Sequence, residues 1–220
     1  MNKAEFIKIN NKNPEENLIQ KCVDVIKAGG SVVYPTETLY GLGVDVFNDE
    51  ACLRVFSIKE RDLQKSLIVH IANVSDINKV AYDVCDDAIK LMKKYWPGAL
   101  TIILKKNKNI SDVISQSNTV GVRIPNNKIE LEIIKKAGTP ITGTSANLSG
   151  NIGIIDPIEA FKELGNRVNI VIDGGICEIG KPSTIIDLSD GNIKLIREGA
   201  ILYSDILNFL DKNENQRFIK

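Results

Sequence analysis

The sequence has little that would serve a nucleic-acid-binding surface. Lys plus Arg and Asp plus Glu number 28 each, so the formal net charge is zero and no overall field attracts polyanions or an anionic membrane. Aromatic residues are only 5% of the chain, which leaves few platforms on which bases could stack. Any anion-binding site must therefore be local.

Cysteine pairs and long apolar runs are also missing. Cys22, Cys52, Cys85 and Cys177 form no CxxC pair and accompany no histidine cluster, so neither a zinc site nor a redox pair is predicted. We expect reduced thiols, mostly in the core. The first residues contain no apolar signal segment, and no stretch approaches the roughly 18 apolar residues of a membrane span. These features predict a cytoplasmic protein without membrane contact.

Signatures of several enzyme classes are absent as well. The chain has no GxxxxGKS or GxxxxGKT stretch and no GxGxxG stretch, so a nucleotide would have to bind through another scaffold. It has no GxSxG elbow, which counts against a Ser-His-Asp hydrolase, although spacing does not exclude Ser145 acting with His70.

What the chain does contain fits one globular α/β domain. With 220 residues, 43% of them apolar, it can bury one substantial core. Periodicity and capping residues predict helices over residues 14–28 (with Asn13 as N-cap), 49–59, 86–95 and 128–137, one starting at Pro157 and one capped by Ser204. Strands are predicted over residues 5–10, 31–36, 66–71, 100–106, 119–125, 140–142, 169–175, 183–189 and 192–199. Because several strands follow one another without a helix between them, a mixed sheet is predicted.

Four segments carry polar residues that neither a core nor a solvated surface requires. The first, YPTETLYGLG (residues 34–43), leaves a buried strand as a loop with threonines and glycines. Loops at strand ends are a common place for ligand-binding groups, because the sheet fixes their position. An ordinary turn is the alternative.

The second segment, SIKERDLQKSLIVHI (residues 57–71), gathers cations beside a strand. Lys59 and Arg61 are two residues apart, so they converge on one ligand only if the helix frays there. With Lys65 they would form a phosphate-binding site, because the Arg guanidinium donates two parallel hydrogen bonds and the Lys ammonium supplies a compact positive charge. The alternatives are cations favoured by a helix C-terminus and a His70 that is a satisfied core residue.

The third and fourth segments place cations and hydroxyl groups at strand ends. In TVGVRIP (residues 119–125), Arg123 lies on the face opposite three aliphatic residues, as a ligand-binding or a solvent-facing residue. The stretch TPITGTSANLSG (residues 139–150) is either a linker or a wall of donors for a polar ligand. GKPSTI and LIREG add similar groups later in the chain.

Together, YPTETLYGLG, KER with LIVHI, YWPGALTIIL, VGVRIP, TSANLSG and PSTIID occur in the order and spacing of one family. Over about residues 12–200 the sequence resembles the YrdC/Sua5 family, the threonylcarbamoyl-AMP synthases. The resemblance implies a single YrdC-like α/β domain over residues 1–220, with a twisted mixed sheet flanked by helices and a large concave cleft. Residues 201–220 would form a C-terminal helix and a polar tail. The short type of the family is expected, without the additional C-terminal domain of the long form.

The resemblance also implies a reaction. L-threonine, bicarbonate and ATP would give L-threonylcarbamoyladenylate, pyrophosphate and water, which makes the protein a nucleotidyltransferase. Mg²⁺ would accompany ATP, and no zinc is expected. The adenylate would pass to the machinery that transfers the threonylcarbamoyl group to tRNA, and a weak contact with tRNA or RNA is left open.

The family's functional positions can be carried over residue by residue. The catalytic KxR and SxN tetrad, expected around the ATP phosphates, corresponds to Lys59, Arg61, Ser145 and Asn147. Further ATP-binding positions correspond to Lys65, Thr119 and Arg197. Positions around the threonine substrate correspond to Thr38, His70, Arg123, Thr144 and Ser183, with Arg123 as partner of the substrate carboxylate. Protein ligands of the metal are not assigned.

Three positions depart from the family pattern. Asp62 and Ser66 stand where proline is common, and Lys65 stands where asparagine is common. The departures concern the shape of the loop after Arg61 and the role of Lys65.

Two other functions compete with the synthase. A module of this fold that binds RNA without synthase activity would use the same basic segments, but zero net charge and few aromatic residues count against it. A carbamoyl-transfer module like the similar domain of hydrogenase-maturation proteins usually comes with acylphosphatase and zinc-finger regions, for which we see neither room nor a cysteine pattern.

Overall fold

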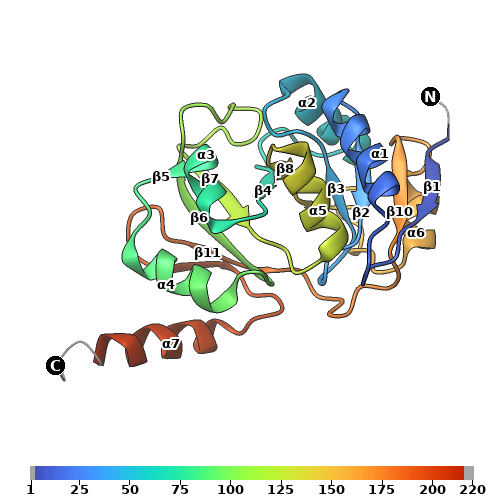
Figure 1. Cartoon of the computed structure of the whole chain (residues 1–220). Helices are drawn as coiled ribbons and strands as arrows, with labels where there is room; N and C mark the ends of the chain where they lie inside the picture. Colours follow the sequence, from blue (N-terminus) through green and yellow to red (C-terminus); the bar gives the residue numbers. More distant parts are fainter. Residues whose placement is uncertain (1–2, 216–220) are drawn as a thin grey trace.

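The computed structural model describes residues 3–215, which form two mixed β-sheets surrounded by helices (Figure 1). The first sheet has the order β1-β10-β2-β3-β9. Its strands are β1 (Glu5–Lys8), β10 (Ile170–Asp173), β2 (Val32–Tyr34), β3 (Gly41–Gly43) and β9 (Thr144–Ser145). Pairs β1·β10 and β10·β2 are parallel, whereas β2·β3 and β3·β9 are antiparallel.

The second sheet has the order β12-β11-β6-β7-β4-β8, and β5 pairs with β6 outside this path. Its strands are β12 (Lys194–Arg197), β11 (Thr184–Asp187), β6 (Leu100–Lys106), β7 (Thr119–Arg123), β4 (Ile68–His70), β8 (Ile141–Thr142) and β5 (Ala81–Tyr82). Parallel pairs β11·β6 and β4·β7 stand beside antiparallel neighbours. The mixed architecture is confirmed, but in two sheets instead of one.

The division into two sheets is made by the stretch 139–150. Before Gly143, β8 pairs with β4 of the second sheet, and directly after it β9 pairs with β3 of the first. The amide of Gly143 itself donates to the carbonyl of Ile68 at 2.8 Å. This segment is therefore the crossing between the sheets and not a linker.

The helices are close to those predicted, and each long one packs an apolar face inward. In Figure 1, α1 and α5 lie side by side over the first sheet, whereas α4 and α7 lie together at the opposite end. A 3₁₀ turn (Val74–Asp76), α3 and β5 were not predicted. The helices are α1 (Glu16–Lys27), α2 (Asp49–Lys59), α3 (Ile77–Val80), α4 (Asp86–Tyr95), α5 (Lys128–Ala137), α6 (Pro157–Leu164) and α7 (Tyr203–Asn215).

Two predicted helix starts are wrong. Helix α1 begins at Glu16 and not at Pro14, because Asn10 accepts from the amides of Lys12 and Asn13 and holds them in a turn. Helix α7 begins at Tyr203, before Ser204, and the Tyr203 amide donates to the carboxylate of Glu198 at 2.8 Å.

The loop predicted over residues 36–43 ends in a strand, β3. Its two glycines lie against the ring of Tyr34 on β2, where an added Cβ at Gly41 or Gly43 would come within 2.7 or 2.5 Å of ring atoms. Glycine appears here because of this close approach and not because the chain turns. Only the preceding threonines remain a loop.

Buried apolar side chains form two clusters, whereas one core was predicted. The smaller cluster packs α1 and α5 on the first sheet, and the larger joins α2, α4 and α6 to both sheets. Two sheets offer more than one apolar face, which explains the division. As predicted, all four cysteines are free thiols; Cys22, Cys52 and Cys177 are buried and Cys85 is half-buried. Within residues 3–215, no helix has the length and apolar character needed to cross a membrane.

Candidate functional site

A cavity of about 270 Å³ is bordered by residues of both sheets. The large concave cleft that the resemblance implies stays a prediction. Most of the predicted site residues line the cavity, although they come from six separate segments of the chain. The predicted site residues that line the cavity are Thr38, Arg61, His70, Thr119, Arg123, Thr144, Ser145, Ser183 and Arg197. Lys59, Lys65 and Asn147 are not among the lining residues.

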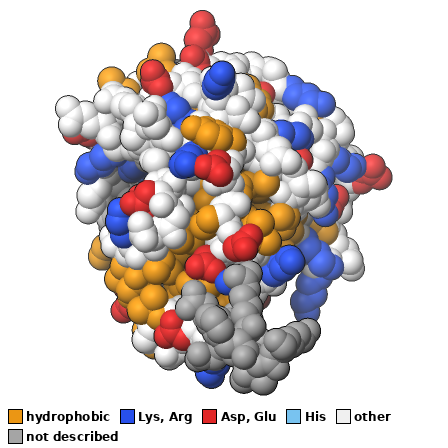
Figure 2. All heavy atoms as spheres, turned by 90° about the vertical axis from the view of Figure 1, so that its left-hand side faces the viewer, with side chains coloured by type: hydrophobic (Ala, Val, Ile, Leu, Met, Phe, Trp, Pro, Cys, Tyr) orange, Lys and Arg blue, Asp and Glu red, His pale blue; other side chains and the backbone are white. Residues whose placement is uncertain are grey.

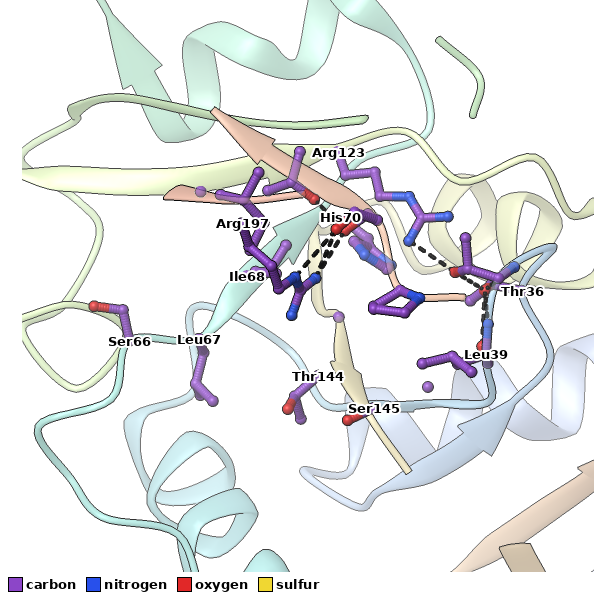
Figure 3. A pocket seen from close by; sticks show the side chains of 18 of the residues that line it. Thr36, Leu39, Ser66, Leu67, Ile68, His70, Arg123, Thr144, Ser145 and Arg197 are labelled. Carbon is purple, nitrogen blue, oxygen red and sulfur yellow. Dashed lines mark hydrogen bonds between the residues drawn. The ribbon is translucent and has the colours of Figure 1, made fainter. Parts of the chain in front are cut away.

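Polar and apolar side chains alternate along the cavity (Figure 3). Ser66 and Leu67 lie at one side of the view, whereas Thr36 and Leu39 lie at the other, near Arg123. Thr144 and Ser145, on β9, lie between the two sides. The arrangement would accept an elongated ligand with polar groups along its length.

Arg61 enters the cavity because α2 ends immediately before it. Glu60 adopts the left-handed conformation (φ 51°, ψ 43°) and ends the helix. An interruption of the helix at this place was the condition that the sequence set for Lys59 and Arg61 to reach one ligand. The Arg61 guanidinium donates to the carbonyls of Lys65 (3.2 Å) and Ser66 (2.8 Å). Burial lowers its pKa. Arg61 therefore offers a partly desolvated cation whose position is held by the loop that follows it.

Lys59 points away from the cavity, into the protein. Its ammonium group donates to the carbonyls of Ser145 and of Asn147, the latter at 2.6 Å, and the residue is 1% exposed. The Lys59 carbonyl also accepts from the Ser149 amide at 2.7 Å. Lys59 thus connects the end of α2 to the TSANLSG segment by hydrogen bonds. Its predicted contact with ATP stays a prediction.

Asn147 supports the same turn. Its side-chain amide donates to the carbonyls of Leu148 (2.8 Å) and Asn151 (2.9 Å), and its Oδ1 is buried without a hydrogen-bond partner. From α6, Glu163 accepts from the Leu148 amide at 2.7 Å. The KxR and SxN motifs therefore divide into residues that face the cavity (Arg61, Ser145) and residues that shape its wall (Lys59, Asn147).

The burial of Lys59 predicts a pH dependence of stability. Desolvation, and secondly the nearby Arg61, lower its pKa from 10.5 to about 8. Between these values the unfolded chain binds more protons than the folded one, so the free energy of unfolding should rise with pH across this window, by about 3 kcal/mol in total. Urea unfolding of the native protein and of Lys59→Met at several pH values would measure this.

The difference in the free energy of unfolding between the native protein and Lys59→Met reports on Lys59 alone. The buried thiols of Cys22, Cys52 and Cys177, whose pKa values burial raises to about 12, act in the opposite direction, but both proteins contain them. A difference that stays constant across the window would contradict the desolvated ammonium.

The loop after Arg61 is closed without the family's prolines. The Asp62 carboxylate accepts from the Gln64 amide at 2.9 Å, forming a side-chain turn. The Ser66 hydroxyl lies 3.0 Å from that of Ser115, which begins a row of hydroxyl contacts through Ser117 to Thr119. Lys65 is exposed outside the cavity, so its predicted role at ATP receives no support from the geometry.

Arg123 is buried, so the solvent-facing alternative is wrong. Its guanidinium contacts the carbonyl of Gly98 (2.9 Å), the hydroxyl of Thr38 (3.1 Å) and the carboxylate of Glu37 (2.7 Å). Glu37 was not predicted as a site residue, although it stands between the threonines of the PTET segment. Its charge compensates that of Arg123 at this end of the cavity.

His70 is paired with a carboxylate that no motif contains. Its Nδ1 lies 2.5 Å from Oε1 of Glu130, and both side chains are buried. Glu130 lies on the buried face of α5, with Ile133 and Ile134. A carboxylate at the spacing of an apolar helix stripe was the sequence signal that could have identified it.

Ser183 and Arg197 meet on the neighbouring wall. Arg197, on the exposed edge strand β12, donates to the Ser183 carbonyl at 2.8 Å, and the Ser183 hydroxyl lies 2.9 Å from that of Thr101. Partial desolvation, and secondly Arg123, lower the pKa of Arg197. Thr101, buried in β6 and lining the cavity, was also missed.

The described residues contain no group of three or more His, Cys, Asp or Glu side chains arranged to hold a metal ion. Mg²⁺ bound to ATP does not need one, because phosphate oxygens and water supply most of its ligands. Two buried carboxylates contact residues of the cavity: Glu37 lies 2.7 Å from Arg123, and Glu130 lies 2.5 Å from His70.

Comparisons with known proteins agree with the arrangement of motifs. The family model for Sua5, YciO and YrdC proteins, described as "Telomere recombination", matches residues 24–199. The threonylcarbamoyl-AMP synthase of Pyrococcus abyssi is 35% identical over 193 residues, 87% of this chain and 57% of that protein. A Methanocaldococcus jannaschii protein is 40% identical over 205 residues, 90% of this chain and 95% of that protein.

Among solved structures, Pyrococcus abyssi Sua5 complexed with L-threonine matches with a TM-score of 0.90 and 33% identity, over 93% of this chain and 60% of that one. The chain thus spans little more than half of the Pyrococcus protein but nearly all of the Methanocaldococcus one. The match over residues 24–199 and these identities show that the chain belongs to the Sua5/YciO/YrdC family.

Proposed function

We propose that the protein is an L-threonylcarbamoyladenylate synthase, a nucleotidyltransferase that joins L-threonine, bicarbonate and ATP and releases pyrophosphate. The observation that carries the proposal is the cavity, which gathers Arg61, Arg123 and Arg197 with the hydroxyl groups of two threonine-rich segments. The similarity to a Sua5 protein crystallised with L-threonine supports the substrate. The product would pass, in the cytoplasm, to the machinery that modifies tRNA.

Threonine is assigned to the end near Arg123, His70 and Thr38. Arg123 supplies guanidinium N–H donors of the kind that bind a carboxylate. Ser183 and Thr144 add hydroxyl groups for the substrate's own hydroxyl. Glu37 compensates the charge of Arg123, so this guanidinium does not present an isolated positive charge, which suits a zwitterion better than a simple anion.

ATP is assigned to the end near Arg61, Thr119 and Ser145. Phosphate oxygens require fixed cations and donors, which Arg61 and, along the wall, Arg197 would supply. Lys59 and Asn147 would act by holding the Ser145 turn in place. Mg²⁺ would enter with ATP and neutralise part of the triphosphate charge.

The chemistry follows from the stability of the intermediates. Only a neutral threonine amine can attack bicarbonate, and the carbamate that forms is unstable in bulk water, so a shielded site must hold it beside the α-phosphate. A carbamate oxygen then attacks the α-phosphorus, and the bond to pyrophosphate breaks. Arg61 stabilises the charge on the phosphate oxygens, and no covalent enzyme intermediate is needed.

The test is pyrophosphate release from ATP by the purified protein, with and without L-threonine and bicarbonate. We expect release only when all three substrates are present, and much less with L-serine as the control. ATP turnover without threonine, or none at all under these conditions, would contradict the proposal.

The alternative RNA-binding function finds no support on the face of the molecule shown in Figure 2. On the face shown in Figure 2, Lys and Arg side chains are mixed with Asp and Glu instead of forming one basic area. A steep salt-dependent affinity for RNA without ATP turnover would be the result expected of that function.

A further inference from the structure

The single histidine of the chain is oriented by Glu130 from within the core. Nδ1 of His70 lies 2.5 Å from Oε1 of Glu130, and the side chains are 3% and 0% exposed. Glu130 lies in the first turn of α5, where the helix dipole favours negative charge. An ionised carboxylate only accepts hydrogen bonds, so the contact requires the imidazole proton on Nδ1 and leaves a lone pair on Nε2.

The other nitrogen of the ring, Nε2, lies over Gly143, a residue that also lines the cavity. His70 lines the cavity, and no described residue makes a hydrogen bond to Nε2 (Figure 3). The ring lies directly over Gly143, where an added Cβ would come 2.1 Å from Nε2. Glycine at the crossing between the two sheets therefore makes room for the imidazole at the cavity wall.

The charges around His70 favour a proton arriving on Nε2. Arg123, which is the register partner of His70 in the β4·β7 pair, is compensated by Glu37. Tyr34 is neutral, because burial and, secondly, Glu130 raise its pKa. The carboxylate of Glu130 is then the one uncompensated charge in contact with the ring, and it would stabilise an imidazolium.

We propose that His70 accepts the proton that the ammonium group of the amino-acid substrate must lose, and that Glu130 is the positioning residue that keeps Nε2 available for it. This role rests on the proposed synthase function. The N–H bond of the ammonium breaks and its proton moves to Nε2. The amine lone pair forms a C–N bond with bicarbonate, and hydroxide leaves with a second amine proton as water. His70 later releases its proton to solvent.

Nitrogen NMR of the full chain tests the orientation without requiring activity. Because the sequence contains one histidine, one imidazole is observed. We expect Nδ1 to carry the proton in the native protein at alkaline pH and this preference to weaken in Glu130→Gln. The matched control is Glu132→Gln on the same helix, a half-buried residue whose solvent-accessible carboxylate pairs with Lys135, which should leave the imidazole unchanged. A native protein with the proton on Nε2 would overturn the proposal even if Glu130→Gln fails to fold.

Steady-state kinetics test the proton transfer. At neutral pH, Glu130→Gln should lower kcat by about 10², with the KM for ATP nearly unchanged. The deficit should shrink at least tenfold as the pH approaches the titration range of the threonine amine, because a growing fraction of substrate then arrives neutral and needs no base. A structural defect would persist at every pH.

The possible failures are distinguishable. A deficit that does not change with pH, or a Glu130→Gln protein as active as Glu132→Gln, would overturn the role of His70 while leaving the synthase function intact. A native protein without threonine-dependent pyrophosphate release would instead contradict the proposed function, and the base role with it. The NMR result would then decide only whether Glu130 orients the ring.

Discussion

Replacing Arg61 with alanine is expected to slow threonine-dependent pyrophosphate release by roughly 10² to 10³, or about 3 to 4 kcal/mol of transition-state stabilisation. Arg61 lines the cavity with a partly desolvated guanidinium, whereas Lys59 is turned into the protein. The loss should appear mainly in kcat, because charge on the phosphate oxygens is redistributed as pyrophosphate leaves. Initial rates at saturating ATP and threonine would measure it.

Two variants sharpen this test. Arg61→Lys keeps a charge but loses the fork that holds the carbonyls of Lys65 and Ser66, so an intermediate loss is expected. Arg167, which pairs with Glu60 beside the same helix end, lies outside the cavity, and Arg167→Ala should change the rate less than threefold or so. Equal rates for Arg61→Ala and the native protein would remove Arg61 from the mechanism.

Replacing Arg123 with methionine should lower the free energy of unfolding by about 3 to 5 kcal/mol, because it leaves the Glu37 carboxylate buried without a partner. The two side chains are 5% and 7% exposed, and the carbonyl of Gly98 loses its donor as well. Urea unfolding would measure the effect, provided that the dependence on urea concentration keeps the same slope.

A double variant and an exposed pair serve as controls. Arg123→Met combined with Glu37→Gln removes both charges and should recover a large part of the loss. Lys194→Met, which breaks the solvent-exposed pair with Asp190, should lower the free energy of unfolding far less than Arg123→Met does. If Arg123→Met costs no more than Lys194→Met, the buried pair does not carry the stability assigned to it.

Local signals predicted the secondary structure well where they acted alone. Helices α2 and α5 begin and end close to the predicted bounds, since Asn48 and Asn127 accept from the first helical amides and Glu60 and Gly138 end their helices in the left-handed conformation. Predictions failed where a side chain outside the predicted element competed. Asn10 withdraws Asn13 from the start of α1, and the Tyr34 ring explains glycines that had indicated a turn.

Most of the residues that line the cavity lie in the sequence motifs, but the motifs did not identify the carboxylates that pair with them. Arg61, His70 and Arg123 were predicted as site residues, and all three line the cavity. Glu37 and Glu130 were missed, because each is recognisable only by the charge or ring it meets across the fold. For Lys59 the motif predicted a contact with ATP, which stays a prediction, but it did not indicate that the ammonium group donates to two carbonyls of a remote turn.

By itself, the sequence determined the family, the α/β character and the set of side chains available for chemistry, because these depend on local spacing and on the order of motifs. Only the tertiary structure decided that the chain forms two sheets crossing at Gly143, that Lys59 and Asn147 support the cavity wall, and that carboxylates hold Arg123 and His70. The physical reason is that burial and pairing of charge depend on groups far apart in the chain. Glu130 and His70 are 60 residues apart and meet only once α5 packs beside β4.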